Sequence, residues 1–78
     1  IFTYKLYIMT YDEVYKRIGL NIKKFRTANG LTQQQLADKL GMSLNFIGKI
    51  EVGFDHPSLY TLIDISNCLE IPLKDLFC

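Results

Sequence analysis

The most informative part of the chain is the stretch from Leu31 to Gly53, LTQQQLADKLGMSLNFIGKIEVG. Its second half has polar residues packed into a short helical pattern. Amide and basic side chains can hydrogen-bond to base edges and phosphates. The stretch therefore suggests a DNA-binding protein.

Residues that support catalysis or metal binding are scarce. His56 is the single histidine, so a catalytic triad or a histidine metal site lacks its other members. No glycine-rich phosphate loop is present. Cys68 and Cys78 have no metal-ligand spacing, and we interpret them as reduced thiols. The sequence therefore predicts a protein that is not an enzyme, that needs no cofactor or metal, and that is cytoplasmic.

Two short amphipathic patterns joined at Gly41 position the polar residues. The first, over residues 32–40, opens with the capping box Thr32–Gln35. The second, over residues 43–53, opens with Ser43 as its N-cap and ends at a glycine. Two helices held by a tight glycine turn form a rigid wedge that fits a DNA major groove.

Three further helical segments are expected around this pair. Residues 11–28 carry apolar side chains at spacings of three and four and stop before Gly30. Residues 58–69 carry more apolar side chains than one core-facing stripe needs, and Pro72 starts a short last helix over 72–77. The expected fold is all-α, a compact five-helix domain.

Residues 1–10 are predicted to be an N-terminal extension of a domain at 11–78. Ile1–Ile8 is rich in β-branched and aromatic residues, which favour a strand. Because Met9 looks like a natural start, three interpretations of the preceding segment are open. It is a sequence added outside the natural protein, a translated leader sequence, or an arm that pairs with a partner chain.

The charge of the chain is unevenly distributed, although its net value is only +1. Residues 16–49 contain seven basic residues against one acidic residue, a net charge of +6, and residues 50–78 contain one basic against five acidic residues, a net charge of −4. Such polarity can orient a protein on a polyanion. The apolar runs are too short to cross a membrane.

Residues 22–77 resemble the phage repressor and Cro family of helix-turn-helix regulators, which is also called XRE-like. The features that carry the resemblance are, in order, Ile22, Phe25-Arg26, Gly30-Leu31-Thr32-Gln33, Leu36-Ala37, Leu40-Gly41-Met42-Ser43, Ile47, Ile50-Glu51, Gly53, Pro57-Ser58-Leu59, Leu62, Ile65, Leu69 and Leu76-Phe77. The resemblance implies a lambda-repressor-like fold with the helix-turn-helix at its second and third helices. It also implies a transcriptional regulator, a repressor or controller, that binds double-stranded DNA sequence-specifically.

In that family the second helix of the motif enters the major groove. The residues that the resemblance and the side-chain chemistry assign to DNA binding are Gln33, Ser43, Leu44, Asn45, Phe46, Lys49, Lys23 and Lys39. Leu44 and Phe46 offer apolar surface for a thymine methyl group, and packing against the core is an equal alternative for Phe46. Lys23 and Lys39 are candidates for phosphate contacts.

The resemblance also implies one structural feature. An ion pair between Arg26 and Glu51 is expected to tie the first helix to the end of the third. A homodimer on a two-fold operator is expected for two reasons. One small DNA-binding domain alone gives little sequence specificity, and the C-terminal third has more apolar residues than the core needs. The candidates for the dimer interface are Tyr60, Ile63, Leu73 and Phe77.

Two alternatives remain open at this point. The short chain resembles stand-alone repressors, including the controller proteins of restriction–modification systems. The same fold can also be a protein-binding module, such as an antitoxin or an anti-repressor target, that uses the surface of residues 58–77.

The chain departs from the family pattern at Leu44, Gly48, Val52, Phe54, Asp55 and Glu70. These departures suggest DNA binding that is weaker, or that depends more on the shape of the DNA than on contacts to bases.

Overall fold

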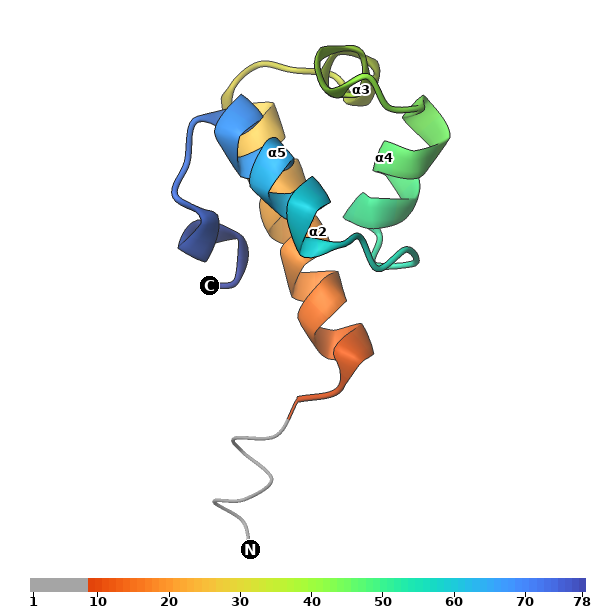
Figure 1. Cartoon of the computed structure of the whole chain (residues 1–78), viewed down its shortest axis with the longest axis vertical. Helices are drawn as coiled ribbons and strands as arrows, with labels where there is room; N and C mark the ends of the chain where they lie inside the picture. Colours follow the sequence, from red (N-terminus) through yellow and green to blue (C-terminus); the bar gives the residue numbers. More distant parts are fainter. Residues whose placement is uncertain (1–8) are drawn as a thin grey trace, which may run out of the picture.

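The computed structural model describes residues 9–78, and within this range it is all-helical, as predicted. The strand or arm expected at residues 1–8 lies outside the described residues. Figure 1 shows the described elements, which are α2 (Tyr11–Ala28), α3 (Gln33–Leu40), α4 (Leu44–Glu51), α5 (Leu59–Leu69) and the 3-10 turn η1 (Leu73–Leu76). No helix in residues 9–78 has the length and hydropathy needed to span a bilayer.

The helix predicted over residues 72–77 is wrong in type, because η1 is a single 3-10 turn. The Asp75 N–H donates to the Pro72 carbonyl at 3.0 Å, which is the three-residue spacing of a 3-10 helix. The Leu76 carbonyl accepts a bond from Asn21 Nδ2 of α2 at 2.9 Å, and the Leu76 side chain is fully buried. These contacts hold the segment against α2 as a turn.

Helix α2 begins with a capping box that the sequence interpretation missed. Thr10 Oγ1 accepts a hydrogen bond from the Glu13 backbone N–H at 3.1 Å, and Glu13 Oε1 accepts one from the Thr10 N–H at 3.1 Å. These bonds satisfy two of the orphan donors at the helix start. The hydrogen bonds that Glu13 Oε1 accepts from the N–H and from the hydroxyl of Thr10 favour the charged carboxylate, so they hold the pKa of Glu13 below its ordinary value of 4.5.

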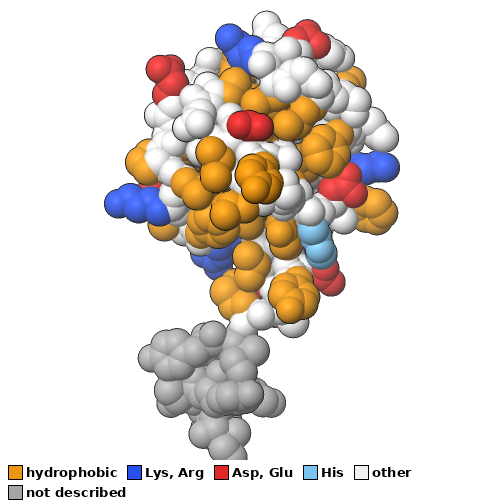
Figure 2. All heavy atoms as spheres, in the orientation of Figure 1, with side chains coloured by type: hydrophobic (Ala, Val, Ile, Leu, Met, Phe, Trp, Pro, Cys, Tyr) orange, Lys and Arg blue, Asp and Glu red, His pale blue; other side chains and the backbone are white. Residues whose placement is uncertain are grey.

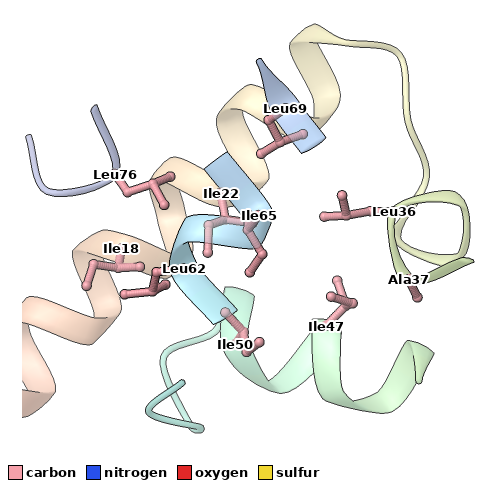
Figure 3. Packing of buried hydrophobic residues seen from close by; sticks show 10 residues of the cluster. All are labelled: Ile18, Ile22, Leu36, Ala37, Ile47, Ile50, Leu62, Ile65, Leu69 and Leu76. Atoms are coloured by element: carbon pink, nitrogen blue, oxygen red, sulfur yellow. The ribbon is translucent and has the colours of Figure 1, made fainter. Parts of the chain in front are cut away.

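The core lies where all four helices and η1 meet. Figure 3 shows that side chains from every element point toward one another there. The buried hydrophobic residues of the described chain are Ile18, Ile22, Leu36, Ala37, Ile47, Ile50, Leu62, Ile65, Leu69 and Leu76. Each fully buried leucine or isoleucine contributes about 1.5–3 kcal/mol of transfer free energy, so this cluster fixes how α4 sits on the other helices.

The turn between α3 and α4 depends on Gly41. Its φ is 67° and its ψ is 30°, the left-handed conformation predicted for this position. Ser43 then caps α4, because its Oγ accepts from the Phe46 N–H at 3.1 Å. Helix α4 ends at Glu51 with Val52 as C-cap. Gly53, the predicted stop, follows with a φ of 80°, and its N–H donates to the Ile50 carbonyl at 3.0 Å.

Candidate nucleic-acid interface

Arg26 and Glu51 form a buried, two-pronged ion pair between α2 and the end of α4. Arg26 Nε lies 2.6 Å from Glu51 Oε2, and Arg26 Nη2 lies 3.0 Å from Glu51 Oε1. Their side chains are only 9% and 2% exposed. Arg26 Nη1 also donates to the Leu31 carbonyl at 2.7 Å, so the pair reaches the segment that leads into α3. This geometry fixes α4 relative to α2 and α3.

Gln33 joins this ion pair, a contact that the sequence interpretation did not foresee. Its Nε2 donates to Glu51 Oε1 at 3.0 Å, and its side chain is half-buried. The bond orients the amide at the first residue of α3, with Oε1 toward Gly48. The predicted DNA contact by Gln33 must therefore use the part of the amide that Glu51 leaves free.

The predicted residues on α4 divide into outward and inward groups. Leu44 is 44% exposed, and Asn45 is also exposed. Lys49 is half-buried, and its Nζ lies 5.8 Å from the centre of the Phe54 ring. Phe46 is half-buried and packs against the core cluster. Of its two predicted roles, DNA contact and core packing, this position fits core packing. Asn45 and Lys49 therefore remain available to a partner.

A shallow groove of about 590 Å³ runs between the start of α3 and the outward side of α4. The residues that line it are Gln33, Leu44, Asn45, Gly48, Lys49, Val52 and Phe54. Lys49 is the single charged residue among them. The groove is therefore mildly basic and largely apolar, which suits a DNA edge better than a cationic partner.

Lys23 and Lys39, the predicted phosphate contacts, are exposed on different helices, α2 and α3. Lys23 lines a second cleft with Lys16 and Gln33, between α2 and the end of α4. Lys39 lies in the last turn of α3. Neither lysine lines the α3–α4 groove, so each lies to one side of the exposed α4 side chains.

The loop after α4 is tethered to α2. The rings of Tyr15 and His56 stack with centroids 4.3 Å apart, and Tyr15 Oη donates to the Pro57 carbonyl at 3.2 Å. His56 Nε2 also lies 3.3 Å from Asp12 Oδ1. These contacts hold the loop that presents Phe54, which is 73% exposed at the edge of the α3–α4 groove.

The two helices α3 and α4, joined at a left-handed glycine and locked to α2, have the form of a helix-turn-helix. A sequence model of the helix-turn-helix family HTH_3 matches residues 22–76. The chain belongs to the helix-turn-helix family. Its helix-turn-helix consists of α3 and α4, and α2, α5 and η1 form the scaffold around it.

Relatives of this helix-turn-helix chain are named as transcriptional regulators. It is 45% identical over 56 residues to the uncharacterized HTH-type transcriptional regulator YqaE of Bacillus subtilis, which covers 72% of this chain and 48% of YqaE. It is 43% identical over 53 residues to the SPbeta prophage-derived regulator YonR of the same organism, which covers 68% of this chain and 49% of YonR. The chain thus spans about half the length of these two relatives.

The helix-turn-helix fold also matches a solved structure over most of both chains. The restriction-modification controller protein C.AhdI from Aeromonas hydrophila superposes with a TM-score of 0.77 at 30% identity. The match covers 81% of this chain and 96% of C.AhdI. YqaE and YonR are thus named as transcriptional regulators, and C.AhdI as a controller protein.

Gly19 controls how closely the scaffold helix α2 approaches the helix-turn-helix. A Cβ at Gly19 would lie 2.6 Å from the Glu51 carbonyl oxygen and would also overlap the Ile50 carbonyl oxygen. The α2 backbone therefore contacts the last turn of α4 directly. The sequence interpretation missed this residue, and the only available signal was a glycine in the middle of an amphipathic helix.

The predicted dimer residues lie on the side of the domain formed by α5 and the C-terminal turn. Tyr60 is 84% exposed, and Ile63 and Phe77 are 38% and 44% exposed. Leu73 is half-buried and packs against the core, so less of it is available. Leu59, which was not among the predicted residues, extends the exposed surface. Figure 2 shows hydrophobic side chains gathered on this face.

Proposed function

We propose that this helix-turn-helix chain is a transcriptional regulator that binds double-stranded DNA sequence-specifically, with α4 in the major groove. The observation that carries the proposal is the outward side of α4. There Asn45 and Lys49 are free of the core, while the buried Arg26–Glu51 pair fixes the helix that presents them. A rigid helix with exposed hydrogen-bonding side chains can read base edges in a major groove.

Each residue of the site takes a role that follows from its position. Asn45 pairs with adenine, and Lys49 contacts guanine or a phosphate. The free backbone N–H groups at the start of α3, next to Gln33, bind a phosphate with the help of the helix dipole. Lys23 and Lys39, on either side of α4, attract DNA phosphates, and this attraction weakens as salt concentration rises.

We further propose that the chain binds DNA as a homodimer through α5 and the C-terminal turn. The exposed side chains of Tyr60, Ile63 and Phe77 support this, because apolar groups that cluster on one face of a small domain often mark an interface. A two-fold dimer would place two copies of α4 about 34 Å apart, one turn of DNA.

The same apolar face supports a second candidate, in which α5 binds a different protein in the manner of an antitoxin or anti-repressor target. A small apolar hollow of about 250 Å³ lies there among Leu59, Tyr60 and Ile63. The two candidates differ in stoichiometry. A chain that stays monomeric at high concentration in the presence of its DNA would favour the second.

The DNA proposal is tested by selecting duplexes from a random library and measuring their affinity for single variants. Asn45→Ala and Lys49→Ala should each weaken binding to the selected duplex by about 1–3 kcal/mol. Lys74→Ala is a control for the loss of a lysine outside α4, because Lys74 is exposed in η1. Since η1 belongs to the proposed dimer face, its effect on DNA affinity should be negligible in a variant that sedimentation shows to assemble like the wild type.

The salt dependence of binding provides an independent measurement. The logarithm of the association constant should fall linearly with the logarithm of salt concentration, by about 0.9 per phosphate contacted. Lys23→Ala and Lys39→Ala should reduce this slope while leaving the preferred sequence unchanged. Recovery of no duplex by the wild-type chain, or unchanged affinity in both α4 variants, would overturn the assignment.

A further inference from the structure

The outward side of α4 carries an apolar stripe between its polar residues. Leu44, Gly48 and Val52 follow at intervals of four, so they lie one above another along the helix and its C-cap. Leu44 is 44% exposed and Val52 is 69% exposed. Gly48 has no side chain, so the stripe dips at its centre.

This dip has room for a group the size of a methyl. A Cβ at Gly48 would meet a single neighbour within 4 Å, which is Gln33 Oε1 at 3.8 Å, an ordinary van der Waals distance. Gln33 cannot swing freely into the space, because its Nε2 is bonded to Glu51. The walls of the dip are therefore Leu44, Val52 and a fixed amide.

The residues around the dip indicate which chemical group can occupy it. Lys49 is the single charged residue that lines the groove, so a polyanion is favoured over a cationic or neutral surface. On the major-groove edge of DNA, the apolar group that projects toward a protein is the 5-methyl group of thymine. Asn45 beside the dip is suited to an adenine.

We infer that the dip over Gly48 receives the 5-methyl group of a thymine, so that the chain selects thymine at a base next to the one that Asn45 reads. This inference rests on the proposed function, because it requires α4 to lie in the major groove. It makes Gly48 a specificity-determining residue through the side chain that it lacks.

The test uses a duplex recovered by the wild-type chain from random DNA, in which each thymine is replaced in turn by deoxyuridine. The two bases differ only in the 5-methyl group. Replacement at the contacted position should lower affinity about threefold to fourfold, the equivalent of leaving one methyl group unburied. Replacement of thymines outside the contacted half-sites should leave affinity unchanged, which serves as the internal control.

Gly48→Ala tests the protein side of the same contact. The added methyl group fills the dip without a clash, and alanine favours a helix more than glycine does, so the variant should fold. Its ratio of thymine affinity to uracil affinity at the contacted position should fall toward one. Leu44→Ala, which removes a wall of the dip, should reduce the same ratio.

The possible outcomes separate this inference from the proposed function. Recovery of no duplex by the wild type would overturn both. Recovery of a duplex in which uracil binds as tightly as thymine at every position would overturn the thymine inference and leave DNA binding intact. A Gly48→Ala variant that kept the full wild-type ratio would also overturn the role of the dip.

Discussion

Glu51 accepts hydrogen bonds from both Arg26 and Gln33 while its side chain is almost completely shielded from water. Glu51→Gln would leave the Arg26 guanidinium buried without a counter-charge. We therefore expect the free energy of unfolding to fall by about 3–5 kcal/mol, measured by urea denaturation with circular dichroism.

A double variant is the control for this prediction. Replacing both Arg26 and Glu51 by methionine removes the two charges together and keeps much of the side-chain volume. The double variant should be more stable than Glu51→Gln, because no unpaired charge stays buried. An equal or larger loss in the double variant would mean that the ion pair itself stabilises the fold.

Glu13 gives the stability of α2 a dependence on pH. Because the folded state lowers its pKa, its contribution is complete above 4.5 and is lost as pH falls through the lowered folded value. Glu13→Gln keeps a side chain that suits the capping box but does not titrate. The melting temperature of the variant should therefore fall less steeply than that of the wild type below pH 4.5. Identical slopes would contradict the prediction.

At the scale of the elements, Gly19 and Gly48 offer a matched pair of substitutions. Gly19→Ala would force the α2 backbone away from the Glu51 carbonyl, so we expect a loss of about 1–3 kcal/mol in the free energy of unfolding. Gly48→Ala, in an open position of α4, should instead add up to about 1 kcal/mol. Thermal denaturation of both variants would measure the contrast, and a stable Gly19→Ala would contradict the close approach.

The helices of residues 11–69 could be predicted because their ends are marked locally. Thr32, Gly41 and Ser43 each act within a few residues of their own position, and the structure shows the caps and the turn that they predict. The contact from Gln33 to Glu51 could not be predicted in the same way. It joins side chains eighteen residues apart, and it depends on how the helices pack.

The final turn was mispredicted for the same kind of reason. Its apolar residues fit a helical pattern, but the bond from Asn21 to the Leu76 carbonyl joins residues fifty-five positions apart. The candidate DNA residues share this limit. Their chemistry could be read from residue types, whereas their exposure depends on tertiary packing, as the half-buried Phe46 shows.

At the scale of the whole molecule, the apolar face of α5 leads to a prediction about assembly. If it joins two copies, Ile63→Asp should convert a dimer to a monomer in sedimentation experiments, because it places a charge in an apolar interface. The melting temperature of the wild type should rise with protein concentration, and that of the variant should not. At concentrations low enough to dissociate the wild type, the two melting temperatures should agree.

The separation of buried and outward residues along α4 has a practical consequence. Ile47, Ile50 and Glu51 hold the helix in place, whereas Leu44, Asn45 and Gly48 point away from the core. The outward positions can therefore be substituted without disturbing the buried contacts that hold α4. Libraries that randomise these three positions should yield variants that fold and that prefer new bases.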